Sequence, residues 1–223
     1  MGLAYPLPSQ RSAIKGKEIN LEDCLGKTVL VIGGDGTFIY AVHQYIDVLD
    51  RVRFFGIHTG TLGFYTDYRD TDFEEFTSDF VKGKVTEYSY PILEGKTEHE
   101  TYYGINEIRV ENAVRTQEMK VYLNNSLFET YRGTGMCVST QLGSTAYNRS
   151  VGGAVIQEGL SLIQMTEIAF TSKSFEGAML GADSEVFPLD NAKRIEISVS
   201  RSKSVRMLKG RDVYYFDRLQ SLF

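Results

Sequence analysis

Cysteine and histidine are scarce in this sequence of 223 residues, and long apolar runs are absent from it. Its two cysteines, Cys24 and Cys137, and its three histidines lack the spacing of metal ligands, so we expect no metal site and a reducing compartment. No stretch reaches the roughly 18 apolar residues that a membrane span needs. The N-terminus also lacks the apolar core of a signal peptide. These absences predict a cytoplasmic protein without a membrane segment.

The charge balance is mildly acidic. Aspartate and glutamate number 29 against 24 lysines and arginines, which gives a formal net charge of −5. Proteins that bind nucleic acids usually carry a basic face, so this balance argues against a nucleic-acid partner. Hydrophobic residues make up 42% of the chain and charged residues 24%, a globular composition that can bury a sizeable core. The length suits one large domain or two small ones.

The first third of the chain alternates between strand and helix patterns. Thr28–Ile32 (TVLVI) is a β-branched run that enters a glycine turn, as a buried parallel strand does. Apolar residues from Phe38 to Leu49 then recur at helical spacing, and Arg53–Ile57 (RFFGI) is typical of a second strand. The spacing of Phe73, Phe76 and Phe80 predicts a second helix, capped by Asp70 or Thr71. Residues 21–83 therefore predict a Rossmann-like α/β unit, within an N-terminal domain that we place at 1–87.

Past Lys84 the pattern changes to alternating segments with few helical stretches. Asn124-Asn125 stands between two of them and is typical of a tight hairpin turn. We expect a β-rich domain at 88–205 and a C-terminal segment, 206–223, that returns to the N-terminal domain. The fold class predicted is thus α/β plus β. The expected strands include VTEYSYPIL, TYYGINEIRV, EMKVYL, SLFETY and MCVST.

One glycine-rich turn carries an acidic residue. In Gly33–Thr37 (GGDGT) the glycines allow close backbone approach, and the start of the next helix favours phosphate. A carboxylate repels phosphate, so Asp35 makes sense as a base or as an acceptor for a ribose hydroxyl. The turn matches neither a Walker A loop nor GxGxxG. Alternatively, Asp35 simply caps the helix that follows.

Three further motifs combine small and polar residues. Gly56–Phe64 (GIHTGTLGF) follows the second strand, so two glycine-rich strand exits meet at one sheet edge, although His58 there is expected to be a loop hydrogen-bonder. Asn106-Glu107 offers an amide and a carboxylate to a ribose diol or an adenine edge. Ser139–Asn148 surrounds a glycine with hydroxyls and a tyrosine, as a nucleotide-binding loop does. Each motif is also compatible with an ordinary turn or strand end, and nothing in the spacing supports a Ser–His–Asp hydrolase.

The order of these motifs carries more information than any one of them. GGDGT, then TLGFYTD, then NE, then GSTAYN with a trailing GG resemble the NAD kinase family from about Val29 to about Phe187. GGDGT is shared with lipid kinases and a type of phosphofructokinase, whereas the TLGFYTD and GSTAY loops resemble NAD kinases specifically. It implies transfer of the γ-phosphoryl group of ATP, or of polyphosphate, to the 2′-hydroxyl of the adenosine ribose of NAD. It also implies Mg²⁺ or another divalent cation, a homodimer or homotetramer, and a site in a crevice between the two domains.

The resemblance also implies roles for individual residues. The catalytic residue would be Asp35, which accepts the hydroxyl proton or orients the hydroxyl. Phosphate would be bound by Gly33, Gly34, Gly36 and Thr37. NAD would be bound by Gly36, Phe64, Tyr65, Asn106, Glu107, Thr134, Thr145, Ala146, Tyr147 and Ser150.

The chain departs from the family pattern at several points. Thr134 stands where the family usually has the aspartate of Gly-Asp-Gly, and Leu142 stands in place of a hydroxyl. The polar loop after Ser150, in which the family commonly carries an arginine, has only Lys173 between Arg149 and Lys193. The N-terminus shows no clear first strand, and no Asp-Gly turn follows Val199. These departures leave open an NAD-binding regulatory relative with weak or no kinase activity. A kinase for a lipid or sugar hydroxyl is a third alternative, against which the TLGFYTD and GSTAY loops argue.

Overall fold

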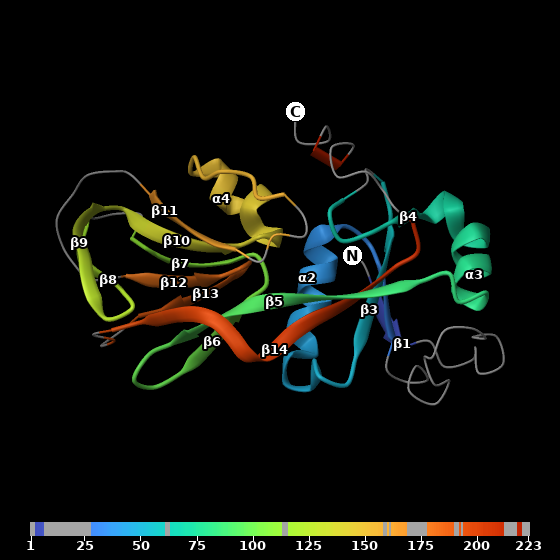
Figure 1. Ribbon diagram of the computed structural model, residues 1–223, viewed down its shortest axis with the longest axis horizontal. Helices are drawn as coiled ribbons and strands as arrows, with labels where there is room; N and C mark the ends of the chain where they lie inside the picture. The colour runs from blue at the N-terminus through green and yellow to red at the C-terminus, as the bar shows by residue number, and fades with distance from the viewer. Residues whose placement is uncertain are drawn as a thin grey trace. The chain divides into compact units, whose positions relative to one another are not determined.

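A computed structural model describes residues 3–6, 28–60, 63–112, 116–157, 160, 162–168, 178–189, 192, 194–211 and 218–219. The chain forms two compact units (Figure 1). The first comprises Met1–Tyr90 with Ser202–Phe223, and the second comprises Pro91–Arg201. The chain passes between them within two long strands, β5 (Thr86–Lys96) and β14 (Glu196–Lys209). Among the described residues, no helix is long and apolar enough to cross a membrane.

The first unit is an α/β structure built on parallel strands. β2 pairs in parallel with β3, and β3 in turn pairs in parallel with β4 and with the end of β14. The buried TVLVI run forms β2 as predicted, because its side chains are covered along the strand. The elements of this unit, besides parts of β5 and β14, are β1 (Leu3–Pro6), β2 (Thr28–Ile32), α2 (Asp35–Gln44), η1 (Ile46–Val48), β3 (Arg53–His58), β4 (Tyr68–Arg69), η2 (Asp70–Asp72) and α3 (Phe73–Val81).

Three local expectations for this unit are wrong. A first strand does exist, since β1 pairs antiparallel with β2, but its four residues are too few to show alternation. The apolar pattern that reaches Leu49 overruns the helix: α2 ends at Gln44, and the chain continues into the short helix η1. Neither Asp70 nor Thr71 caps α3, because both lie in the turn of η2 and the cap position falls on Asp72.

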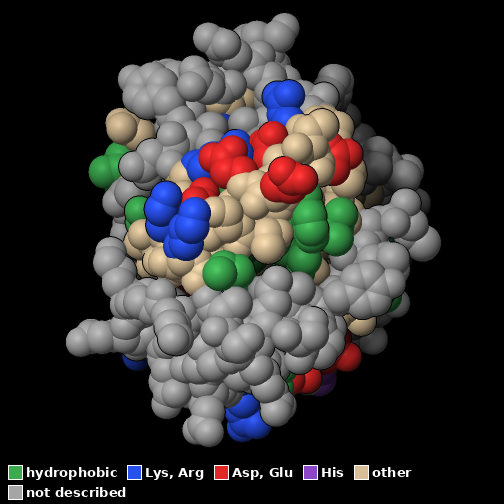
Figure 2. Space-filling model, turned by 90° about the vertical axis from the view of Figure 1, so that its right-hand side faces the viewer, with side chains coloured by type: hydrophobic (Ala, Val, Ile, Leu, Met, Phe, Trp, Pro, Cys, Tyr) green, Lys and Arg blue, Asp and Glu red, His purple; other side chains and the backbone are tan. Residues whose placement is uncertain are grey.

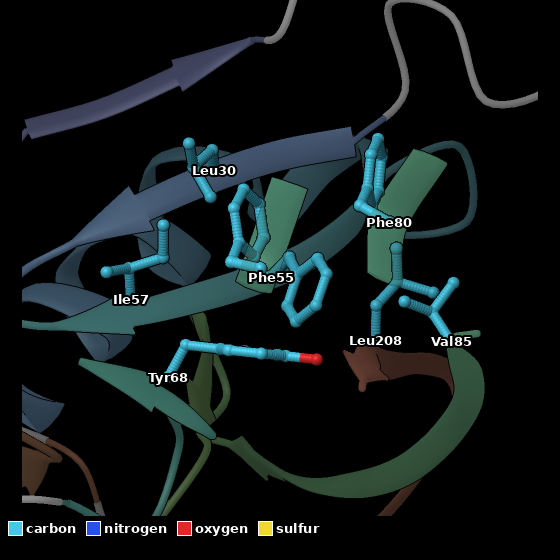
Figure 3. Packing of buried hydrophobic residues seen from close by; sticks show 8 residues of the cluster. Leu30, Phe55, Ile57, Tyr68, Phe80, Val85 and Leu208 are labelled. Carbon is cyan, nitrogen blue, oxygen red and sulfur yellow. The ribbon is translucent and has the colours of Figure 1, made fainter. Parts of the chain in front are cut away.

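Aromatic packing holds α3 against the sheet. Phe76 and Phe80 lie one turn apart on one face of the helix, and their ring centroids are 4.9 and 5.8 Å from that of Phe55 on β3. Tyr68 on β4 completes the cluster, with its ring 5.8 Å from that of Phe55 and 5.6 Å from that of Phe76 (Figure 3). Each such ring contributes about 1.5–3 kcal/mol when fully buried. The Phe spacing that predicted the helix therefore also defines its buried face.

The second unit is β-rich and antiparallel. Its main sheet has the strand order β11-β10-β7-β12-β13, β8 and β9 form a separate hairpin, and β6 pairs with the end of β5. At the tip of the hairpin Asn124 and Asn125 have φ values of 49° and 66°, so the predicted tight turn is confirmed. The further elements are β6 (Thr101–Gly104), β7 (Glu107–Glu111), β8 (Gln117–Leu123), β9 (Ser126–Gly133), β10 (Gly135–Thr140), η3 (Leu142–Thr145), α4 (Tyr147–Ser150), β11 (Ile163–Ile168), β12 (Met179–Ala182) and β13 (Glu185–Pro188).

The core of the second unit lies on one face of β7. Ile108 is buried with Leu180 of β12 and Leu93 of β5. Because side chains alternate along a strand, the neighbouring residues of β7 project to the opposite face, and these are Glu107, Arg109 and Glu111. The central strand of this sheet therefore has one apolar face and one charged face.

Both acidic and basic side chains occur on the face of the molecule in Figure 2. On the face in Figure 2, the described residues of both signs lie close together instead of forming a patch of one sign. Arg211 illustrates the mixing, since its guanidinium forms ion pairs with both Asp72 and Glu75.

Candidate functional site

Asp35 lies at the start of α2, but it does not cap that helix. Gly34 occupies the cap position, and Asp35 is the first helical residue. Its carboxylate instead accepts two hydrogen bonds from the backbone of a distant loop: the N–H of Phe64 donates to Oδ2 at 2.9 Å, and the N–H of Tyr65 donates to Oδ1 at 3.2 Å. The alternative of a helix-capping aspartate is therefore wrong. The two glycine-rich turns at the ends of β2 and β3 meet at this carboxylate.

Glycine makes this close approach possible. A Cβ atom on Gly63 would lie 2.1 Å from Oδ1 of Asp35, so no side chain fits between the loop and the carboxylate. Gly33 has a φ of 155° and a Cβ there would lie 2.6 Å from Oγ1 of Thr37, so the turn itself also requires glycine. Gly36 is exposed, and a Cβ on it would meet nothing within 4 Å. The first turn of α2 thus presents open backbone beside Asp35.

The neighbours of Asp35 have different surroundings. His58, at the end of β3, is buried; burial lowers its pKa, and the nearby charge of Asp35 acts in the opposite direction. Its Nδ1 has no hydrogen-bond partner in the described part of the chain, so the expected hydrogen-bonding role is not seen at that atom. Tyr65 contributes its backbone N–H to Asp35, while its ring stacks on Phe38 at 5.1 Å within the core.

In the second unit the Asn106-Glu107 turn is held by a residue that sequence reasoning missed. The carboxylate of Asp183 accepts the N–H groups of Ile105 (2.8 Å), Asn106 (2.6 Å) and Glu107 (3.1 Å). Asp183 is buried in the turn between β12 and β13 and has a φ of 52°. Aspartate tolerates this left-handed conformation, so the Ala-Asp-Ser sequence between two strand patterns was the available signal.

Glu107 is a buried acid with one unused oxygen. Its side chain is 5% exposed, and Oε1 lies 3.4 Å from Nη1 of Arg109. Oε2 has no hydrogen-bond partner among the described residues. Burial, followed by the charge of Asp183, raises the pKa of Glu107 to about 8, although Arg109 lowers it. A buried carboxyl oxygen without a partner is unfavourable unless a ligand satisfies it.

Arg109 links Glu107 to Tyr147. Its Nε donates to Oε1 of Glu111 at 3.0 Å, and its Nη1 donates to the carbonyl of Asp183 at 2.8 Å. The guanidinium lies 4.7 Å from the ring centre of Tyr147, whose hydroxyl donates to Oε2 of Glu111 at 3.0 Å. Burial and the hydrogen bond to Glu111 raise the pKa of Tyr147 to about 12. The tyrosine therefore stays neutral and is fixed in orientation.

The loop that precedes Tyr147 packs against the Asn106 turn. A Cβ on Gly143 would lie 2.0 Å from the carbonyl oxygen of Asn106, so this contact again requires glycine. The hydroxyl of Thr140 donates to the carbonyl of Ile105 at 2.7 Å, and the N–H of Thr140 donates to that of Asn106 at 2.8 Å. Thr145 and Ala146 belong to this loop, and the hydroxyl of Thr145 donates to a carbonyl within it. The structure thus brings the NE and GSTAY motifs together.

Two further predicted residues belong to other segments of the second unit. Thr134 joins β9 to β10, where its carbonyl accepts the N–H of Asn112 at 2.9 Å and its N–H donates to the carbonyl of Ile168 at 2.9 Å. Ser150 is exposed at the end of α4. Apart from these two, the predicted residues form two groups, one around Asp35 in the first unit and one around Asn106-Glu107 in the second.

These features define a class: a two-unit protein with a loop-held carboxylate on its α/β unit and a buried Asn-Glu turn on its β-rich unit. A family model described as the ATP-NAD kinase C-terminal domain matches residues 105–218. The NAD kinase of Lactobacillus helveticus (strain DPC 4571) is 36% identical over 222 residues, which cover 87% of this chain and 82% of that protein. The chain belongs to the NAD kinase family.

Two further comparisons define the extent of the likeness. The NAD kinase of Limosilactobacillus reuteri subsp. reuteri (strain JCM 1112) is 44% identical over 148 residues, which cover 64% of this chain and 55% of that protein. The chain thus spans little more than half the length of this relative. The structure of an NAD kinase from Archaeoglobus fulgidus in complex with ATP superposes with a TM-score of 0.71 at 22% identity, covering 97% of this chain and 88% of that one. The predicted α/β plus β fold of NAD kinases is confirmed.

Proposed function

We propose that the protein is an NAD kinase, which transfers the γ-phosphoryl group of ATP, or of polyphosphate, to the 2′-hydroxyl of the adenosine ribose of NAD. The observation that carries this proposal is the carboxylate of Asp35, which is held by two amide N–H groups of a neighbouring loop and is not used as a helix cap. A carboxylate fixed in this way can accept a hydroxyl proton or orient the hydroxyl for in-line attack.

Phosphate binding is assigned to the turn that precedes α2. A helix N-terminus carries partial positive charge and favours phosphate, and the exposed Gly36 leaves room for a phosphate group to approach. Asp35 would repel a phosphate placed directly against it. We therefore assign Gly33, Gly34, Gly36 and Thr37 to the phosphates and Asp35 to the acceptor hydroxyl.

The second unit supplies the proposed contacts for NAD. The buried Oε2 of Glu107 has no partner in the described part of the chain, so it can bond to the adenosine portion. Tyr147 offers a ring whose orientation is fixed by Arg109 and Glu111. The other proposed NAD contacts in this unit are Asn106, Thr145, Ala146, Ser150 and Thr134, which directly precedes β10.

The divalent cation is assigned to the substrate. Among the described residues, no group of three or more histidine, cysteine, aspartate or glutamate side chains could hold a metal ion. Mg²⁺ commonly binds through substrate phosphates with one or two carboxylates. We therefore propose that Mg²⁺ or a similar ion arrives with ATP. We also propose, from the family resemblance, that the enzyme acts in the cytoplasm as a homodimer or homotetramer.

One feature favours a second candidate, an NAD-binding regulatory relative with weak or no kinase activity. Thr134 replaces a charged residue that the family usually carries, and its backbone is committed to the sheet. Loss of a charge weakens ligand binding or transition-state stabilisation without disturbing the fold. The two candidates differ in turnover and agree in NAD binding.

The test is formation of NADP from NAD, ATP and Mg²⁺, followed with an NADP-specific dehydrogenase. Asp35→Asn should bind NAD but lose at least about 100-fold in kcat, because general-base help is typically worth 10²–10⁴. Asp47→Asn, which removes an exposed carboxylate just beyond α2, is the matched control. Near-normal turnover in Asp35→Asn would exclude the proposed role. No turnover in the wild type, with NAD still raising the melting temperature, would favour the regulatory relative.

A further inference from the structure

Arg218 is a buried cation near the C-terminal end of the first unit. It is 2% exposed, which is rare for arginine unless it is paired. Its Nη1 donates to the carbonyls of Gly63 and Thr66, both at 2.8 Å, and its Nη2 forms an ion pair with Oδ1 of Asp67. All three partners lie in the loop that follows β3, more than 150 residues away in sequence. Arg218 therefore holds this loop from one side.

The same loop holds Asp35 from its other side. The carbonyl of Gly63 and the N–H of Phe64 belong to one peptide group: the carbonyl accepts from Arg218, and the N–H donates to Asp35. In a planar trans peptide these two groups point in opposite directions. A single rigid plane thus connects the guanidinium of Arg218 to the carboxylate of Asp35. Hydrogen bonds in such a chain polarise and strengthen one another.

Asp67 makes the arrangement a stable one. It is also buried; burial raises its pKa, and the charge of Arg218 lowers it. The other oxygen of Asp67 accepts the N–H of Gly210, at the end of β14, at 3.2 Å. Separating a buried ion pair leaves an uncompensated buried charge, which is strongly unfavourable. Movement of the loop away from Arg218 would have this cost, so the pair holds the loop in place. The guanidinium bonds three acceptors at once, which a lysine ammonium on a flexible stem does less well.

We propose that Arg218 is a positioning residue for Asp35, acting through the peptide plane between Gly63 and Phe64. This inference rests on the proposed function, in which Asp35 handles the acceptor hydroxyl. Displacement of a catalytic group by about 1 Å can cost about 100-fold in rate. Because the hydrogen bonds of Arg218 to Gly63 and Thr66 support the loop that holds Asp35, its loss should lower kcat more than it raises the KM for NAD.

The kinetic test compares Arg218→Lys and Arg218→Met with Arg211→Lys, a control in the same C-terminal stretch. Arg211 forms ion pairs with Asp72 and Glu75, and its guanidinium lies over the ring of Tyr68. Rates are normalised to the number of NAD-binding sites, so that a loss of folded protein does not count as a loss of kcat. We expect kcat to fall about 10- to 100-fold in the Arg218 variants, less in lysine than in methionine, with a KM for NAD within about threefold of wild type. An unchanged kcat, or a change confined to KM, would overturn the proposal.

A second measurement does not depend on activity. The amide proton resonance of Phe64, measured by NMR, should move in Arg218→Lys and stay in place in Arg211→Lys, because only the first change weakens the polarising partner of that peptide. If Arg218→Met does not fold, Asp67→Asn replaces it, since it keeps the shape of the pair and removes the charge that orients Arg218. An unmoved Phe64 resonance in both Arg218→Lys and Asp67→Asn refutes the inference. Full turnover in Asp35→Asn would instead refute the catalytic role proposed for Asp35, and the Phe64 resonance would still show whether Arg218 polarises the peptide that holds it.

Discussion

Glu107→Gln should change how stability depends on pH. Burial, assisted by Asp183, raises the pKa of Glu107 to about 8 from 4.5. Below pH 4.5 the carboxyl is protonated in both the folded and unfolded states. Between these two values only the folded protein holds the proton, so the free energy of unfolding of the wild type falls as pH rises, and above about pH 8 it levels off. Glutamine does not titrate, so the variant should gain on the wild type across this window.

The size of the gain follows from the same shift. The difference, 8 − 4.5 = 3.5 pKa units, corresponds to about 5 kcal/mol at about 1.4 kcal/mol per unit. This is an upper limit, because Arg109 and the neighbouring carboxylates can rearrange around the charged form, and we expect about 2 kcal/mol. Urea unfolding of both proteins at pH 5, 6, 7 and 8 measures it, with Glu118→Gln on the exposed hairpin as a surface control. Parallel pH dependences for wild type and Glu107→Gln would refute the reasoning.

Three more outcomes follow from the second unit. Gly181→Ala should lower the free energy of unfolding by about 1–3 kcal/mol, because a Cβ there would lie 2.6 Å from Cζ of Arg109; an unchanged urea midpoint would contradict this. Asn148→Ala should cost about 2–4 kcal/mol by the same assay, since the buried amide forms hydrogen bonds with two carbonyls and two side chains, and a loss under about 1 kcal/mol would speak against it. Burial raises the pKa of Cys137 to about 12, so in a Cys24→Ser background a thiol reagent should label it no faster than the protein unfolds; rapid labelling of the native protein would be the contrary result.

Local patterns were sufficient for several individual elements. The β-branched run at Thr28–Ile32, the aromatic spacing from Phe73 to Phe80 and the Asn124-Asn125 turn each depend on neighbours within a few residues, and each was predicted correctly. The end of α2 was not predicted, because distant partners influence it. Lys203, from β14, donates to the carbonyl of Ile46 just past the helix at 2.6 Å, and no local pattern contains that contact.

The candidate site divides in the same way. Asp35 could be singled out because an acid among turn glycines is chemically unusual. Asp183 could not be assigned to the Asn106 turn, because 77 residues separate the two partners and a two-residue turn reveals nothing about what its side chain binds. Arg218 is further still from its loop, at 155 residues from Gly63. The role of a supporting residue depends on which distant residues it contacts in the fold. Sequence patterns indicate the type of a local element and do not give those contacts.

The two units solve one problem in the same way. Each must bring backbone polar groups against a functional side chain or turn without an intervening Cβ atom. Gly63 does this at Asp35, and Gly143 does it at the carbonyl of Asn106; a Cβ would come within 2.1 Å and 2.0 Å of oxygen atoms at these positions. In each unit a distant charged residue then fixes the backbone at this contact: Arg218 binds the carbonyl of Gly63 itself, and Asp183 binds the Asn106 turn against which Gly143 packs. Glycine permits the close approach, and the buried charge orders backbone on one side of the contact. The glycines that identified the motifs in the sequence are therefore only half of each site, and the other half lies in residues that the motifs do not contain.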